Sequence, residues 1–287
     1  MNMKNFLSRT AASFIVAGGL VAAGSVTAQA SAYMLSEGQN MYTTGFTYST
    51  ATDWFNQNRN RVPQGCTSKD YSWNNSYTYG YSYYTNLFAS ASLANQACGA
   101  GAKSTGLGDV TLGIRGRLDI TRNGRTWELA AIIPTGYDAQ RINRLGYGKF
   151  GLWGGVAFSS QNTGWEEKAP SYWEVGTGLN YWFGSPATQW KSYAKWSWRL
   201  DEDGVNRIVL KGTLKLSLRD HTPEPIPAAG GFFRNSGDYD AGVIQASYAR
   251  RVSDQWTVGF GVGETIWGRN VSASRFADIS FTYSWDD

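Results

Sequence analysis

Lysine and arginine recur at alternate positions in two neighbouring segments, 190–200 and 205–219. The odd-numbered cations are Lys191, Lys195, Arg199, Arg207, Lys211, Lys215 and Arg219. The even-numbered positions of both segments carry mainly tryptophan, leucine and isoleucine. Because a β-strand points alternate side chains to opposite faces, each segment would have one apolar and one cationic face. A row of cations of this kind attracts anionic solutes.

Residues that could perform covalent or metal chemistry are scarce. The only histidine, His221, lies in the loop-like segment 219–227, so no serine–histidine pair can be placed on a strand face. One histidine, two cysteines and scattered acids make no metal-ligand cluster. We therefore expect neither an enzyme nor a bound cofactor, and an outer-membrane lipase is the least favoured function.

Twelve segments have the composition and alternation of β-strands, and helix-period patterns are scarce. Their approximate ranges are 39–51, 70–83, 87–95, 108–121, 125–137, 148–159, 172–184, 189–200, 205–219, 239–251, 255–267 and 274–285. Short turns such as Asn123-Gly124 alternate with longer loops, which is typical of bacterial membrane barrels. The links 160–171 and 185–188 depart from this rhythm. The sequence predicts an all-β fold, a transmembrane antiparallel up-and-down β-barrel of about twelve strands.

The same alternation assigns further charged residues to the interior of the barrel. The additional inward cations are Arg115, Arg117 and Lys149, and the inward acids are Asp119, Glu128, Glu174, Asp201 and Asp278. In one interpretation the acidic side chains reach across the lumen, pair with the cations and help to fill a narrow barrel. In the other, uncompensated lysine and arginine form a path for anionic solutes such as carboxylates. The sequence is compatible with both interpretations.

The first 30 residues have the three parts of a secretory signal peptide. Lys4 and Arg9 accompany an apolar run at 11–23, and small residues follow at 28–30. The apolar run is too short and too interrupted by glycine for a membrane span of roughly 20 residues. We expect cleavage after Ala30 or Ala32, which divides the chain into a signal peptide, 1–30, and one barrel domain, 31–287.

Loss of Lys4 and Arg9 takes two from the 26 basic residues and none from the 22 acidic residues, so the mature chain is nearly neutral. This balance argues against a nucleic-acid-binding protein. The two cysteines, Cys66 and Cys98, fall in predicted loops of an exported chain, where a disulfide is favoured over two free thiols. Such a bridge would connect the outer loops of two neighbouring hairpins.

Two consecutive segments resemble a known family of membrane barrels. The stretch GLGDVTLGIRGRL spans Gly106–Leu118, and ELAAIIPTGYD spans Glu128–Asp138. A Gly-x-Gly-Asp strand start followed by a Pro-Thr-Gly strand end is similar to the outer-membrane proteins called MetA-pathway of phenol degradation. The likeness covers roughly residues 106–183. It implies a transporter-like barrel, loosely related to long-chain fatty-acid transporters, that admits hydrophobic or aromatic compounds, and it carries over no catalytic residue.

Together these features predict an outer-membrane channel of a Gram-negative bacterium that passes small solutes, whether hydrophobic, aromatic or anionic. The expected partners are outer-membrane lipid, a small-molecule solute and, during insertion, the barrel-assembly machinery. The alternative is a structural or surface-interaction barrel whose lumen is closed by ion pairs. These two functions differ in whether the lumen conducts.

Overall fold

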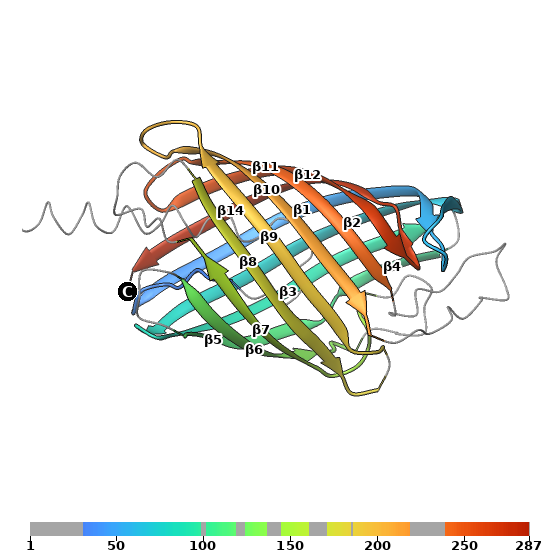
Figure 1. The fold of residues 1–287 in the computed structure, drawn as a ribbon, viewed down its shortest axis with the longest axis horizontal. Coiled ribbons are helices and arrows are strands. Elements are labelled where there is room, and N and C mark those ends of the chain that lie inside the picture. The colour runs from blue at the N-terminus through green and yellow to red at the C-terminus, as the bar shows by residue number, and fades with distance from the viewer. Residues whose placement is uncertain are drawn as a thin grey trace, which may run out of the picture.

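The computed structural model describes residues 31–98, 102–118, 124–136, 145–160, 171–184, 186–218 and 239–286. These residues form a single antiparallel sheet that closes on itself as a barrel (Figure 1). Within them, no helix is long and apolar enough to span a membrane. The predicted signal peptide, 1–30, lies outside the described residues.

The strands follow one another around the barrel in chain order. Their bounds are β1 Gln39–Phe55, β2 Arg61–Ser82, β3 Thr85–Cys98, β4 Ala102–Leu107, β5 Val110–Arg117, β6 Arg125–Ile133, β7 Gly151–Ser159, β8 Ser171–Trp182, β9 Gln189–Arg199, β10 Asn206–Ser217, β11 Asp240–Arg251, β12 Trp256–Arg269, β13 Val271–Ser272 and β14 Arg275–Asp286. Strand β1 pairs with both β2 and β14, and this pairing closes the sheet.

The barrel has twelve strands, as the sequence predicted. Strands β4 and β5 both pair with β3 and act as one barrel strand, interrupted at Gly108 and Asp109. The two-residue strand β13 pairs only with the end of β1. The barrel end that carries residue 39 and residue 286 is called the terminal end below, and the opposite end is called the loop end.

The alternation of side chains confirms that the outer face is apolar. On β10, Ile208 and Leu210 are 38% and 46% exposed on the outside of the barrel. Their neighbours Arg207 and Val209 are 7% and 4% exposed because they point inward. A two-faced strand of this kind is stable when lipid or another apolar medium contacts the outer face and a polar lumen occupies the centre.

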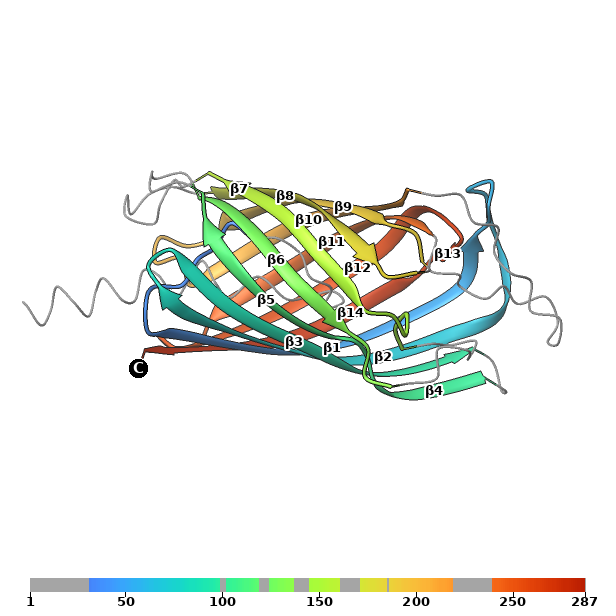
Figure 2. The ribbon, with the colours of Figure 1, turned by 90° about the horizontal axis from the view of Figure 1, so that it is seen from below.

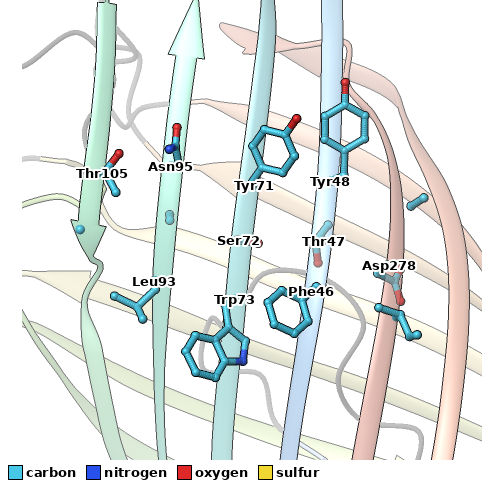
Figure 3. A pocket seen from close by; sticks show the side chains of 14 residues that line it. Phe46, Thr47, Tyr48, Tyr71, Ser72, Trp73, Leu93, Asn95, Thr105 and Asp278 are labelled. Carbon is cyan, nitrogen blue, oxygen red and sulfur yellow. The ribbon is translucent and has the colours of Figure 1, made fainter.

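Aromatic rings gather on the outer face of the barrel, for example along β1 and β2. Phe46 of β1 stacks on Trp73 of β2, with 5.7 Å between ring centroids, and Tyr48 lies 5.0 Å from Tyr71 one pair further along (Figure 3). Together with Leu93 of β3, these rings line a surface hollow of about 510 Å³. Such rings form the interfacial girdles of membrane barrels. We therefore assign this hollow to the apolar outer wall and not to the lumen.

Two predicted loops, 52–69 and 96–107, are largely strand. Strand β1 continues to Phe55 and β2 begins at Arg61, while β3 continues to Cys98 and β4 begins at Ala102. Figure 2 shows β1 and β2 extending past the ends of β8 and β9. Their sequences do not alternate between apolar and polar residues, so they lack the pattern from which the other strands were predicted.

The two cysteines lie on these strand extensions and not in loops. Cys66 of β2 is bonded to Cys98 of β3, with the Cα atoms 5.7 Å apart. The predicted disulfide is therefore present, but it joins two paired neighbouring strands instead of two separate loops. Its place is the loop end of the barrel, away from the charged interior.

Candidate functional site in the barrel lumen

Six cations from β9 and β10 form one band on the inner wall, which we call the cationic strip. Its members are Lys191, Lys195, Arg199, Arg207, Lys211 and Lys215. The pairing of the two strands places them side by side as Arg199 with Arg207, Lys195 with Lys211, and Lys191 with Lys215. Like charges in direct cross-strand positions repel each other. The strip therefore needs counter-charges, water or a ligand.

Glu174 of β8 neutralises one member of the strip. Its carboxylate accepts a 2.9 Å bond from Lys195 Nζ and further hydrogen bonds from the hydroxyls of Tyr172 and Tyr193. Glu174 and Lys195 are 1% and 7% exposed. All of these groups lie on β8 or β9, so the neutralisation occurs within the wall and not across the lumen.

Glu128 of β6 serves a different cation. Arg115 of the adjacent β5 donates from Nε at 2.9 Å and from Nη2 at 2.8 Å to Glu128 Oε2. Trp153 donates its indole N–H to the other carboxylate oxygen at 2.9 Å. Another predicted acid, Asp278 of β14, accepts a 3.0 Å hydrogen bond from Gln245 of β11. Glu128 is thus paired with Arg115, and none of its bonds goes to a lysine or arginine of the cationic strip.

Four cations of the strip have no acidic partner among the residues that the structure describes. Within the described part of the chain, Lys191, Arg199, Arg207 and Lys215 form no ion pair. The Nε atom of Arg207 is buried without a hydrogen-bond acceptor. Positive charge therefore remains on this side of the lumen.

Aromatic rings accompany the inward cations. Lys191 Nζ lies 5.8 Å from the ring of Trp153, Lys195 Nζ lies 5.5 Å from Tyr172, and Lys211 Nζ lies 5.8 Å from Tyr193. Trp153 can lie flat against the wall because Gly178 faces it. A Cβ atom on Gly178 would come within 2.4 Å of the indole ring. The wall of the lumen thus combines fixed positive charge with flat aromatic surfaces.

The chain preceding β1 lies inside the barrel at its terminal end. Thr126 Oγ1 donates to the carbonyl of Ser31 at 2.6 Å, and Arg115 Nη1 donates to the carbonyl of Tyr33 at 3.2 Å. Leu35 is 1% exposed. Gly80 of β2 permits this course, since a Cβ atom there would lie 1.8 Å from the carbonyl oxygen of Ser36. Residues 31–38 are therefore packed against β2 and β5–β6 in the lumen.

The segment 145–150, before β7, also contributes to the lumen. The hydroxyl of Tyr147 accepts a 2.9 Å hydrogen bond from Lys215 Nζ, and its ring packs edge-on against Trp182 at 4.6 Å. Tyr239, just before β11, lies with its ring centroid 3.7 Å from the same ammonium group. Neither tyrosine was among the predicted site residues. Tyr147 lies in the loop before β7, where no alternation determines direction. Tyr239 stands at the first position of the predicted strand 239–251, one residue before β11 begins.

The remaining predicted site residues are less closely connected with the strip. Lys149 precedes β7 and its side chain is exposed, so the alternation of β7 does not fix its direction, contrary to the sequence interpretation. Arg117 ends β5 with its guanidinium 4.4 Å from the ring of Tyr83. Asp201 lies in the turn after β9 and accepts hydrogen bonds from Asn206. Arg219 and Asp119 lie outside the described residues.

No group of acids, histidines and cysteines in the described part of the chain could hold a metal ion. Models of known protein families give no match to this chain, and neither do curated proteins.

Solved structures with a similar fold include two membrane barrels. An outer membrane channel from Pseudomonas putida F1 superposes with a TM-score of 0.70 at 9% identity, over 92% of this chain and 100% of the other. The NanC porin superposes with a TM-score of 0.51 at 6% identity, over 84% of this chain and 98% of its own. At these identities the likeness concerns the fold, and it agrees with the twelve-stranded barrel described above.

Proposed function

We propose that this barrel is a channel of the bacterial outer membrane that passes small solutes and favours anions. An apolar outer face with aromatic girdles suits a lipid environment, and the fold is similar to those of a channel and a porin. The signal peptide expected at 1–30 would provide export. The likeness of Gly106–Leu118 to the phenol-degradation family adds aromatic compounds to the candidate solutes.

The observation that carries the anion preference is the incomplete neutralisation of the cationic strip. Lys191, Arg199, Arg207 and Lys215 face the lumen without an acidic partner among the described residues. Fixed charges of one sign on a low-dielectric wall raise the local concentration of the opposite ion and repel ions of the same sign. The lumen would therefore select chloride and carboxylates over potassium.

Planar-bilayer recording in a potassium chloride gradient tests this function. We expect the purified barrel to conduct with a reversal potential on the anion-selective side. The double variant Lys191→Gln/Lys215→Gln should shift the reversal potential toward zero. Lys69→Gln, which removes an exposed lysine from the outer face of β2, is the matched control and should leave the potential unchanged. Cation selectivity of the unaltered barrel would refute the anion path.

A closed structural barrel is the second candidate, and one observation favours it. Residues 31–38 and the ion pairs of Glu128 and Glu174 occupy part of the lumen at the terminal end and along β5–β9. In that case the barrel would present its loops to partners while no solute crosses. A barrel that inserts into bilayers and never conducts, with or without residues 31–38, would favour this candidate.

A further inference from the structure

We propose that Lys191 and Lys215 form a binding site for the carboxylate of an aromatic monocarboxylic acid. This inference deepens the channel function proposed above by assigning its solute class. The two lysines are direct cross-strand partners near the loop end of the barrel and are 6% and 9% exposed. Cross-strand partners have Cβ atoms about 4.5–5.5 Å apart, so both ammonium groups can reach one anion.

The wall around this pair is electrically neutral. On β8 the partner of Lys191 is Gly178, and on β11 the partner of Lys215 is Ala241. The next inward residues along β9 are Gln189 and Tyr193. Those along β10 are Thr213 and Ser217. No neighbouring inward position on these four strands thus supplies a carboxylate to either lysine.

Two described acids on the neighbouring strands β8 and β11 are bound to other cations. Asp240, at the start of β11, pairs with Arg269 Nε at 3.0 Å and with Arg59 at 3.4 Å. Glu174 is bonded to Lys195, two residues along β9 from Tyr193. A pair of buried like charges without a counter-ion is unfavourable, and an external anion between them would remove the repulsion.

The aromatic rings around the two lysines favour a ligand whose remaining part, beyond the carboxylate, is a planar ring. Trp153 lies 5.8 Å from Lys191 Nζ, while Tyr147 and Tyr239 lie 5.5 and 3.7 Å from Lys215 Nζ. The hydroxyl of Tyr147 accepts a 2.9 Å hydrogen bond from Lys215 Nζ, so this ammonium group lies directly beside the aromatic surface. Flat apolar surfaces beside two ammonium groups suit a planar acid, whose ring can pack on them while its charge is paired.

The test uses fluorine NMR of 4-fluorobenzoate with the full-length folded barrel in detergent micelles, and empty micelles as the blank. We expect line broadening that yields saturable binding. Lys191→Gln and Lys215→Gln should each weaken binding about tenfold or more, because a charge-assisted bond is lost. Lys191→Arg, which keeps the charge, should retain most of the affinity. Lys69→Gln, an exposed lysine on the outer face of β2, is the matched control and should bind normally.

Two further probes define the ligand class. Fluoroacetate has the carboxylate without the ring, and 4-fluorobenzyl alcohol has the ring without the charge. We expect both to bind at least about tenfold more weakly than 4-fluorobenzoate. Equal binding of fluoroacetate would overturn the aromatic class, and equal binding of the alcohol would overturn the role of the two lysines. Unchanged binding of 4-fluorobenzoate to both glutamine variants, confirmed as folded by heat-modifiable migration, would overturn the site itself.

Failure of this site is distinguishable from failure of the proposed channel. If the unaltered barrel is anion-selective in potassium chloride but does not bind 4-fluorobenzoate, only the binding site is wrong. If 4-fluorobenzoate binds through Lys191 and Lys215 but no condition produces conductance, the site stands and the channel function is wrong.

Discussion

At the scale of single residues, Glu174 neutralises one cation of the strip, Lys195, and so lowers the repulsion among its charges. Its carboxylate accepts bonds from Lys195, Tyr172 and Tyr193 while being almost fully buried. We expect Glu174→Gln to lower the free energy of unfolding by about 3–5 kcal/mol, the usual cost of removing one member of a buried ion pair. Urea unfolding of the barrel in micelles, followed by tryptophan fluorescence, measures the change.

Two controls separate the charge of Glu174 from its hydrogen bonds. Tyr172→Phe removes one neutral donor to the same carboxylate and should cost only about 1 kcal/mol. The double variant Glu174→Gln/Lys195→Met removes both charges and should recover much of the loss. A Glu174→Gln barrel that unfolds at the same urea concentration as the unaltered one would show that Lys195 does not need this partner.

The sequence predicted the composition of the lumen better than its contacts. The alternation of odd and even positions along β9 and β10 was sufficient to predict that Lys191 and Lys215 point inward, since side chains of a strand point to only two faces. It could not predict that Glu128 and Glu174 bind cations of the neighbouring strand, because that choice depends on the register. Tyr147 carries no such signal, since a loop residue has no periodicity from which its direction follows.

At the scale of the strand, the apolar outer face should make the stability of the barrel depend on contact with lipid. We expect Leu210→Arg, at an outward position in the middle of β10, to destabilise the folded barrel by about 2–4 kcal/mol in phospholipid vesicles. The penalty arises because the guanidinium must leave water for the hydrocarbon layer. Leu210→Met, which keeps the volume and polarity, should change the stability by less than about 1.5 kcal/mol. If both variants unfold alike, the outer face of β10 does not contact lipid.

Strand prediction succeeded where one face is apolar and failed where neither is. Strand β9 was expected at 189–200 and runs Gln189–Arg199. Its even positions carry three tryptophans, and its odd positions carry mainly polar or basic residues. Strand β2 was expected from residue 70 and begins at Arg61. Its first nine residues, RVPQGCTSK, do not alternate between apolar and polar side chains, so the two-residue period is absent there, although five of them pair with β1.

At the scale of the whole molecule, residues 31–38 pack inside a lumen that forms only when β14 pairs with β1 and closes the sheet. No local pattern in these residues predicts where they lie, since their partners come from strands far apart in the chain. Ser31 contacts Thr126 of β6, and Gly38 donates its N–H to the carbonyl of Gly80 on β2 at 2.9 Å. The segment therefore depends on the finished barrel, and it occupies part of the lumen at the terminal end.

Removal of residues 31–37 downstream of a replacement leader should raise the single-channel conductance several-fold, because the conductance of a water-filled pore grows with its free cross-section. The β1–β14 ladder begins at Gln39, so the barrel itself should fold as before, with unchanged heat-modifiable migration. Glu37→Gln alters the one clearly exposed side chain of the segment and should leave the conductance as it was. A truncated barrel with unchanged conductance would mean that solutes already pass the segment freely, on the side of the lumen formed by β8–β12.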